Sequence, residues 1–527
     1  MTHSSGRRPW SPPRTGRRRT ALVAAAMATV FVAVGPSSAA GPVAATGPRP
    51  LGIGDPLYPQ LGNPGYDVTA YDIALDYRRQ DQPLDAVTTI DARATASLRS
   101  VNLDFTQGSV RSVRVDGARA GFVTTGEDLV ITPSGRIRQG AAFTITVHHT
   151  SDPHGGSSGG WVRTRDGLAM ANQANAAHQV FPCNDHPSDK ARFSFRITAP
   201  KALKVVAGGL PGKRVRKGAR TTWTYRLAHP MATELAQVSI GRSAVLHRTG
   251  PHRLPIRDVV PTADRARLEK WLARTPGQLA WMEKRVGPYP FENYGLLISN
   301  ATTGFELETQ TLSLFERGLF TTHELPRWYI GSIMVHELAH QWFGDSVSPR
   351  RWSDVWLNEG HATWYEALYA DERGKASLER RMRRAYGQSD AWRAAGGPPA
   401  APRPADPGQQ IGIFRPVVYD GSALVLYALR QRIGRAAFER LERRWVLRHR
   451  DGVASTADFI RLASEVSGRD QAGFLHPWLY GTSTPPMPGH PGWKSDEKRS
   501  AKGAPLPSVR RAMREVRHAV QPVAKPE

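Results

Sequence analysis

Two histidines four residues apart carry the strongest chemical signal in this 527-residue sequence. His336 and His340 belong to a His-Glu-Leu-Ala-His run, and helix positions i and i+4 lie one above the other on one face. Two imidazoles presented in this way can bind one Zn²⁺ through ring nitrogens, while Glu337 between them stays available as a general base. A catalytic zinc also needs a third protein ligand and an open position for water. Glu359, which follows after a gap of eighteen residues, is the natural candidate for that ligand.

Two helices must position these residues. Apolar residues at 335, 338, 339 and 343 give segment 333–343 an apolar side, so this helix can pack in a core with its histidines turned to a cleft. Segment 356–369 also has a helical pattern and carries Glu359 near its start. The alternative is an amphipathic helix that carries two histidines and binds no metal, and the second helix with its glutamate argues against it.

The rest of the chain changes its pattern from strands to helices. Short alternating runs between about residues 66 and 245 predict an all-β region, sandwich-like or saddle-like, without a long helix. A helical pattern then opens at Thr262 and ends at a Gly-Pro-Tyr-Pro turn, and a strand pair is expected at 294–299 and 308–314. Residues 390–412 are rich in Ala, Pro and Gly and predict a surface loop, after which helical patterns resume over 419–478.

These patterns predict an α+β chain of several domains. We expect a signal peptide at 1–40, a flexible leader at 41–60, a β domain at 61–250, a mainly helical domain at 251–485 and a basic, disordered tail at 486–527.

Composition and the amino-terminal pattern indicate where the protein is located and which partners it does not bind. The formal net charge is +25, but no basic stripe interleaved with aromatic residues stands out, so we expect a solvated basic surface and no nucleic-acid partner. The arginines at 17–19, the apolar stretch at 20–34 and the small residues at 38–40 predict an export signal and a secreted protein. That stretch is short for a bilayer span, so we expect no membrane span once the signal is removed. An uncleaved anchor or attachment to the cell envelope is the alternative.

The cysteine count bears on stability. Cys183 is the only cysteine, which excludes an intrachain disulfide, so the protein must rely on its core and on its metal. We expect a monomer.

Several separate motifs together resemble a known family. The segments 352–360 (Trp-Ser-Asp-Val-Trp-Leu-Asn-Glu-Gly), 181–185 (Phe-Pro-Cys-Asn-Asp) and 287–291 (Gly-Pro-Tyr-Pro-Phe) are similar to motifs of the zinc aminopeptidases typified by aminopeptidase N and leukotriene hydrolase, within the gluzincins. The resemblance covers about residues 55–485. It implies a β saddle followed by a thermolysin-like, mainly helical catalytic domain, without the large C-terminal helical domain of many members.

The resemblance also implies roles for residues around the histidines. One zinc ion held by His336, His340 and Glu359 would polarise a peptide carbonyl and acidify its bound water, and Glu337 would move the proton to the leaving amine. Tyr419, sixty residues past Glu359, fits the hydroxyl donor that stabilises the oxyanion. The family has a basic residue and a glycine after this tyrosine where this chain has Gly421 and Ser422, and a structural tyrosine is the alternative.

Glu366 lies two helical turns beyond Glu359 on the same face. A carboxylate in this position could orient a ligand histidine, and an ordinary exposed glutamate is the alternative.

Recognition of the substrate's free ammonium group separates an exopeptidase from an endopeptidase. The family uses the glutamate of a Gly-x-Met-Glu-Asn edge strand, and the resemblance places Glu308 there, with Phe305 where the family has its glycine. Glu306 is the competing assignment. Gln173, counted back from the motif at 181–185, takes the place of the family's second anchor, and a loop amide is the alternative.

Three functions are therefore open. The first is a secreted zinc aminopeptidase that acts on peptides, and the second is a zinc endopeptidase with relaxed recognition of the amino terminus. The third is a catalytically silent peptide-binding relative, which the presence of His336, Glu337, His340 and Glu359 disfavours.

Overall fold

The computed structural model describes residues 51–154, 159–404 and 412–495. The predicted signal peptide at 1–40, residues 41–50 of the predicted leader and residues 496–527 of the predicted tail lie outside the described residues. No helix in the described part of the chain is long and apolar enough to cross a membrane.

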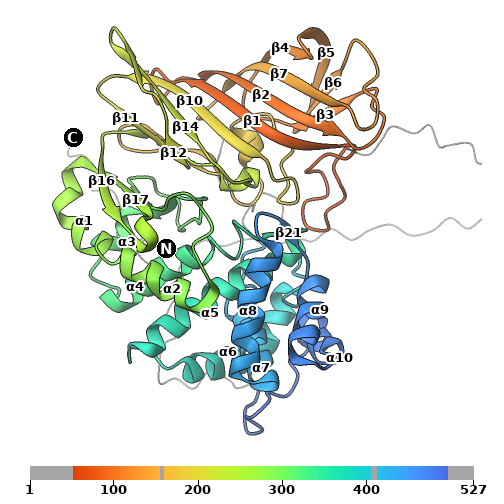
Figure 1. The fold of residues 1–527 in the computed structure, drawn as a ribbon, viewed down its shortest axis with the longest axis vertical. Coiled ribbons are helices and arrows are strands. Elements are labelled where there is room, and N and C mark those ends of the chain that lie inside the picture. Colours follow the sequence, from red (N-terminus) through yellow and green to blue (C-terminus); the bar gives the residue numbers. More distant parts are fainter. Residues whose placement is uncertain (1–50, 155–158, 405–411, 496–527) are drawn as a thin grey trace, which may run out of the picture. The chain divides into compact units, whose positions relative to one another are not determined.

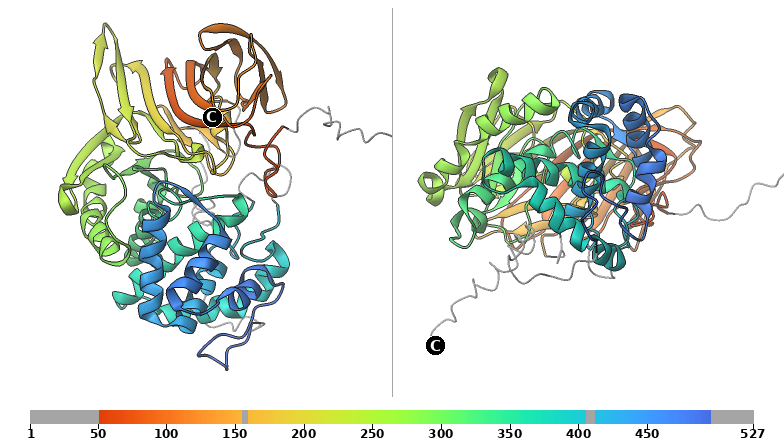
Figure 2. Two further views of the ribbon diagram at one scale, coloured as in Figure 1. Left: turned by 45° about the vertical axis from the view of Figure 1, so that its right-hand side comes forward. Right: turned by 90° about the horizontal axis from the view of Figure 1, so that it is seen from below.

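The amino-terminal half of the described chain is built from strands (Figures 1 and 2). Within the described residues eleven strands form one large sheet, in the order β12-β14-β10-β1-β2-β7-β4-β5-β6-β3 with β13 beside β14. Only β1 and β10 pair in parallel within this sheet. The strands are β1 (Tyr66–Asp76), β2 (Leu84–Ala94), β3 (Val101–Asp104), β4 (Val110–Val115), β5 (Ala118–Thr125), β6 (Asp128–Thr132), β7 (Ala142–Ser151), β10 (Arg192–Pro200), β12 (Leu210–Pro211), β13 (Val215–Lys217) and β14 (Arg220–Arg226).

Alternation along the strands explains how this sheet buries one face. In β1, Tyr71, Ile73 and Leu75 are buried and the residues between them are partly exposed, as expected for side chains that point to opposite faces in turn. A second sheet packs with the first around one apolar core and has the order β11-β15-β9-β8. Its strands are β8 (Gly160–Arg163), β9 (Leu168–Ala171), β11 (Lys204–Ala207) and β15 (Val238–Gly241).

A third sheet leads into the helices. It has the order β16-β17-β18-β19, formed by β16 (Ser243–Thr249), β17 (Pro255–Pro261), β18 (Leu296–Ser299) and β19 (Ser313–Glu316). The expected strand pair is present as β18 and β19, which are parallel neighbours. The second expected strand lies later than predicted, because Glu308 precedes β19 in a segment joined to it by the bridge between Leu307 and Leu314.

The described residues also contain ten α-helices, of which α1 and α2 lie between β17 and β18, and a second large apolar core lies among them. They are α1 (Arg265–Leu272), α2 (Thr275–Val286), α3 (Arg317–Thr321), α4 (Arg327–Ala339), α5 (Trp356–Glu372), α6 (Leu378–Gly396), α7 (Asp420–Ile433), α8 (Arg435–His449), α9 (Thr456–Ser467) and α10 (Ala472–Tyr480). A short pair, β20 (Ser348–Pro349) with β21 (Val453–Ala454), joins the turn after α4 to the segment after α8.

Local sequence explains the ends of α4. Its first residue follows Pro326, whose backbone is extended, and proline is well tolerated at a helix start because it lacks an N–H to satisfy. Past the helix the chain turns at Gly344, whose φ of +135° is open to glycine and strained for other residues. The amide N–H of Gly344 bonds the carbonyl of Val347, so the chain folds back towards α5.

Three stretches differ from the sequence-based expectations. Residues 51–60, which the sequence assigned to a flexible leader, are held against the rest of the chain. Asp55 accepts hydrogen bonds from the backbone amides of Leu57 and Trp352. The loop expected at 390–412 was wrong for residues 390–396, which complete α6. The Arg393 guanidinium donates to the backbone carbonyls of Trp478 and Gly481 at the end of α10 and so holds this part of the helix. Within residues 486–495, placed in the tail, Trp493 stacks on Tyr427 of α7 at 6.0 Å.

Candidate active site

Helices α4 and α5 bring the three predicted metal ligands together. The Nε2 atom of His336 lies 3.3 Å from Oε2 of Glu359, and the Nε2 atom of His340 lies 3.6 Å from the same oxygen. The two imidazole rings are 4.9 Å apart between centroids. All three side chains are buried. The sequence spacing therefore corresponds to one compact group of donor atoms.

This donor group fits a single zinc ion. Ligands bound tetrahedrally at about 2.0–2.1 Å from zinc are about 3.3–3.4 Å from one another. The nitrogen-to-oxygen separations in the group are close to that value, and two histidines with one carboxylate are a donor set typical of catalytic zinc.

Two carboxylates lie against the ring of His336 and raise its pKa. Its Nε2 atom faces Glu359, and its Nδ1 atom lies 3.2 Å from Oε2 of Glu366. Burial alone would lower the pKa of His336, but the two carboxylates outweigh burial and raise the pKa to about 9. The same carboxylates favour a bound cation at Nε2, and Glu366 holds the ring in the required orientation. The structure thus places Glu366 against a predicted ligand and not on the surface.

Glu366 is itself held by an arginine that the sequence did not single out. The Arg381 guanidinium of α6 donates to Oε1 of Glu366 at 2.8 Å and to Oδ1 of Asp420 at 2.7 Å. Asp420 follows Tyr419 directly in the chain. Arg381 lies in an arginine-rich stretch of α6, and nothing in the sequence distinguishes it from its neighbours.

Glu337 and Tyr419 lie at the same group. Burial raises the pKa of Glu337 well above its ordinary value, although the nearby His340 opposes this. The ring of Tyr419, just before α7, lies 6.0 Å from the ring of His336 between centroids. Both residues line the pocket that contains the donor group.

The predicted anchors for the substrate's ammonium group contact each other across the two halves of the chain. The Gln173 amide, from the loop after β9, donates to Oε1 of Glu308 at 2.6 Å, and that oxygen lies 3.9 Å from Nδ1 of His340. Gln341, next to His340, donates to the backbone carbonyl of Glu308 at 3.0 Å and so fixes the anchor segment against α4.

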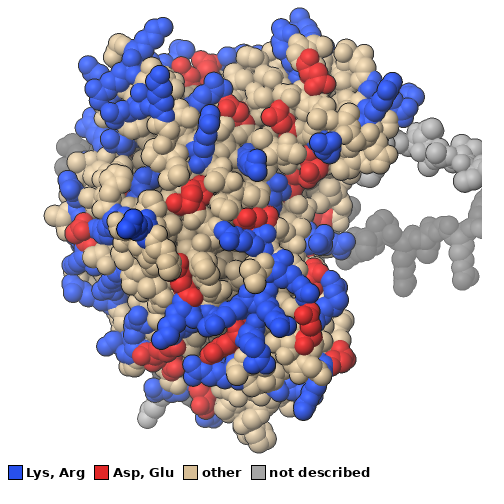
Figure 3. All heavy atoms as spheres, viewed as in Figure 1, with Lys and Arg blue, Asp and Glu red and all other residues tan. Residues whose placement is uncertain are grey.

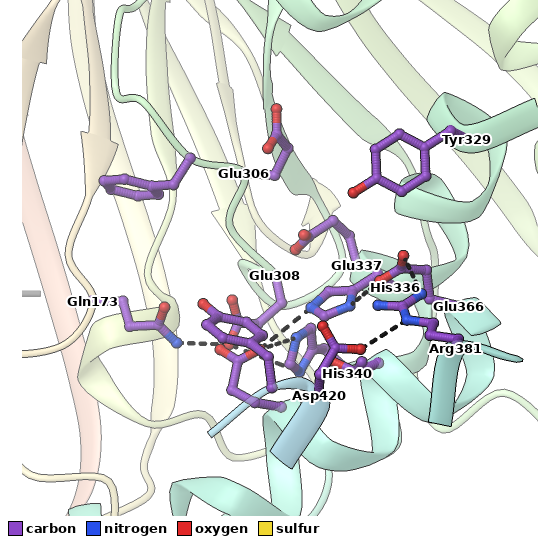
Figure 4. Close-up of a pocket in the computed structure, with 14 residues that line it drawn as sticks. Gln173, Glu306, Glu308, Tyr329, His336, Glu337, His340, Glu366, Arg381 and Asp420 are labelled. Atoms are coloured by element: carbon purple, nitrogen blue, oxygen red, sulfur yellow. Dashed lines mark hydrogen bonds and ion pairs between the residues drawn. The ribbon is translucent and has the colours of Figure 1, made fainter. Parts of the chain in front are cut away.

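All eight predicted site residues line one pocket (Figure 4). The pocket also contains residues that sequence reasoning did not assign to it: Phe305, Tyr329, Thr363, Arg381 and Asp420. For Tyr329 a signal existed, because it lies seven residues before His336 and therefore two turns away on the same helix face. Glu306, weighed as a competitor of Glu308, lines the pocket together with it, so the structure brings both glutamates to the site.

Two models of one family match the chain in sequence. The Peptidase M1 N-terminal domain matches residues 68–235, and the Peptidase family M1 domain matches residues 273–478. The chain belongs to peptidase family M1. The resemblance inferred from the motifs is therefore confirmed, as is the prediction of an N-terminal β domain followed by a mainly helical catalytic domain.

Solved structures and curated proteins agree with this assignment. The M1 zinc metallopeptidase from Deinococcus radiodurans is 26% identical with a TM-score of 0.70, over 83% of this chain and 99% of that one. A mutant of that enzyme bound to a Tyr-Ser-Ala substrate gives a TM-score of 0.69 at 26% identity, over the same shares.

Among curated proteins, tricorn protease-interacting factor F2 from Thermoplasma acidophilum is 26% identical over 79% of this chain and 53% of its own length. Aminopeptidase N from Rattus norvegicus is 28% identical over 38% of this chain and 22% of its own length. The chain thus spans about half or less of the curated M1 relatives that it matches.

Proposed function

We propose that this M1 family member is a zinc-dependent aminopeptidase that removes the first residue from peptides. The observation that carries the proposal is the bond between Gln173 and Glu308 beside the donor group. A carboxylate and an amide, both buried, lie beside His340, where they would meet the end of a peptide bound across the donor group. A free ammonium group is the peptide terminus that satisfies this carboxylate.

Each side chain of the site has a separate role in the proposed hydrolysis. A zinc ion bound by His336, His340 and Glu359 supplies a Lewis acid and an acidified water at neutral pH. Glu308 binds the substrate's ammonium and fixes the first peptide bond over the donor group. Glu337 accepts the proton of the attacking water and gives it to the leaving amine. The Tyr419 hydroxyl donates to the carbonyl oxygen as negative charge develops on it.

The activity test compares free and blocked amino termini. We expect hydrolysis of aminoacyl fluorophores and of short peptides with a free amino terminus, and no internal cleavage of the same peptides after acetylation. Rapid internal cleavage of the acetylated peptides would favour the endopeptidase alternative. Turnover of neither set by the zinc-loaded protein would favour the silent peptide-binding alternative.

The role of Glu337 has a separate test. We expect Glu337→Gln to lower kcat by about 10²- to 10⁴-fold, because the general base is lost while the ligands remain. Metal analysis should still find one zinc per chain in this variant, and a chelator should abolish the activity of the unaltered protein. Full activity of Glu337→Gln would contradict the mechanism.

We also propose that the chain is exported. The basic, apolar and small-residue order of residues 1–40 supports this proposal. Expression of the full chain followed by amino-terminal sequencing of the extracellular protein tests it, with a start at Gly41 expected. Retention of the full-length chain in the cell would contradict it.

A further inference from the structure

Glu306, an acidic residue of the pocket, has no role in the chemistry above. Glu306 is buried, and neither carboxylate oxygen has a hydrogen-bond partner in the described part of the chain. By contrast, Oε1 of the neighbouring Glu316 accepts hydrogen bonds from the backbone amide of Gly304, at 2.5 Å, and from the Thr303 hydroxyl, at 3.2 Å. A buried carboxylate without a partner is costly, so its presence in a binding pocket points to a partner that arrives with the ligand.

Glu306 and Glu308 belong to one short extended segment. Leu307 between them exchanges both backbone hydrogen bonds with Leu314 of β19, at 2.9 and 2.7 Å, and its side chain is buried. Alternation therefore puts the two glutamates on the same face, about 7 Å apart along the segment. The pairing of Leu307 also turns the backbone N–H and C=O of Glu306 away from β19, towards the open edge.

A peptide that lies along this edge advances by about 3.4 Å per residue. With its ammonium group at Glu308, the peptide has its second residue about halfway towards Glu306, and a long side chain on that residue can cover the remaining distance. Figure 4 shows Gln173 and Glu308 on one side of the histidines and Glu306 and Tyr329 on another.

Glu337, the proposed base, lines the same pocket as Glu306 and Glu308 (Figure 4). The base protonates the leaving amine, and that nitrogen belongs to the second residue of the peptide.

We propose that Glu306 binds the side chain of a lysine or arginine at the second residue of the peptide, so that the enzyme acts preferentially on N-terminal residues that precede a basic one. This inference rests on the proposed aminopeptidase function. An ammonium or guanidinium group would provide the counter-charge that the protein does not, and arginine can bond both carboxylate oxygens at once.

The surroundings of Glu306 suit a long cationic side chain. Phe305 and Tyr329 line the same pocket, and their rings can cover the methylene groups of lysine or arginine while the charged end reaches the carboxylate. Burial, with Glu316 nearby, raises the pKa of Glu306 to about 8, as expected for a carboxyl group whose counter-ion is absent.

The test compares tripeptides that differ only in the second residue, on the zinc-loaded full chain. Leu-Arg-Ala and Leu-Met-Ala have side chains of similar length, and Leu-Glu-Ala reverses the charge. We expect kcat/KM to be roughly ten- to hundredfold higher for Leu-Arg-Ala than for Leu-Met-Ala, and lowest for Leu-Glu-Ala. Glu306→Gln, which keeps the shape and removes the charge, should bring the Arg-to-Met ratio close to one.

Two further variants sharpen the comparison. Glu306→Lys should reverse the order, so that Leu-Glu-Ala becomes the better substrate. Glu324→Gln removes an exposed glutamate in the same part of the chain and should leave the ratio as in the unaltered protein. Since each ratio is measured within one variant, a loss of folded protein does not change it.

Three results would overturn the inference. They are equal rates for the Arg and Met peptides, a preference that survives Glu306→Gln, and a Glu306-dependent preference for lysine or arginine at the first residue. Hydrolysis of leucyl fluorophore, which lacks a second residue, reports on the proposed function alone. Its absence would refute that function, whereas its presence with equal tripeptide rates would refute only the role of Glu306.

Discussion

At the scale of single residues, the donor group is held by a chain of alternating charges. His336 contacts Glu366, Glu366 binds Arg381, and Arg381 also binds Asp420, the neighbour of Tyr419. Burial lowers the pKa of Arg381, but Asp420 and Glu366 outweigh this and keep it well above its ordinary value. One guanidinium thus positions both a metal ligand and the residue proposed to bind the oxyanion.

Removal of this guanidinium should weaken the site in two ways. We expect Arg381→Gln to lower zinc affinity about 10- to 100-fold, because Glu366 loses the partner that orients it. We also expect a lower kcat at saturating zinc, because Asp420 no longer fixes the start of α7. Competition with a chelator measures the first effect and steady-state kinetics the second.

Arg380→Gln is the matched control, since Arg380 is exposed on the same helix. An Arg381→Gln protein that kept zinc and kcat like this control would show that the charge chain has no positioning role.

At the scale of the elements, the close approach of α5 and α7 fixes the distance between the metal ligands and Tyr419. Gly360 follows the ligand Glu359, and a Cβ atom at Gly360 would lie 2.7 Å from Cβ of Ser422. Two carbon atoms cannot approach so closely, so only glycine lets the helices meet here.

Gly360→Ala should therefore separate the two helices. We expect a loss of about 1–3 kcal/mol in the free energy of unfolding and a lower kcat, because overpacking displaces Tyr419 from the donor group. The double variant Gly360→Ala with Ser422→Gly removes the clashing atom and should recover part of both losses. Chemical denaturation and steady-state kinetics measure them.

Gly473→Ala is the control, because a Cβ atom there meets nothing within 4 Å. A Gly360→Ala protein as stable and active as this control would mean that the helices do not need glycine at their contact.

Much of the site could be predicted because its signals are local or match a family motif. His336 lies on α4 and His340 caps the end of that helix one turn later, and Glu359 and Glu366 lie two turns apart on α5, so helix periodicity relates them directly. The bond between Gln173 and Glu308 joins residues 135 positions apart. The resemblance to a family places both residues near the substrate's amino terminus, which spacing alone cannot do.

Contacts without such a signal were not predictable. Arg381 looks like any arginine of a solvated helix until α6 packs against α5 and α7. The end of α6 was missed because its Ala- and Gly-rich sequence resembles a loop, and the buried Arg393 that holds it bonds to residues more than eighty positions away. Packing of this kind depends on the tertiary fold and not on local propensity.

At the scale of the whole molecule, one lysine joins the β domain to the catalytic domain. The Lys190 ammonium donates to the backbone carbonyls of Asp345, Ser346 and Gly452, at 2.7, 2.9 and 3.4 Å. Burial lowers the pKa of Lys190 to about 8, although nearby carboxylates oppose this. The ammonium contacts the turn that follows the second ligand histidine, and so it couples the two domains near the site.

Lys190→Met should leave these carbonyls without their donor. We expect the free energy of unfolding at pH 7 to fall by about 2 kcal/mol or more, since buried polar groups without partners are costly. Chemical denaturation measures the change.

Lys201→Met removes an exposed lysine of the same domain and should have little effect. Equal stability of the two variants would show that the domain contact does not depend on Lys190.

The charged side chains of the pocket are mostly acidic, whereas the protein as a whole has a net positive charge. Glu306, Glu308, Glu337 and Glu359 line the pocket, whereas the chain as a whole has a net charge of +25 and Lys and Arg dominate the face in Figure 3. A peptide with a net positive charge is thus repelled at long range, and its ammonium group is attracted once it enters the pocket. Salt screens the long-range repulsion far more than the contacts in the buried pocket. Moderate ionic strength therefore speeds the encounter with cationic peptides while leaving their binding at the carboxylates largely intact.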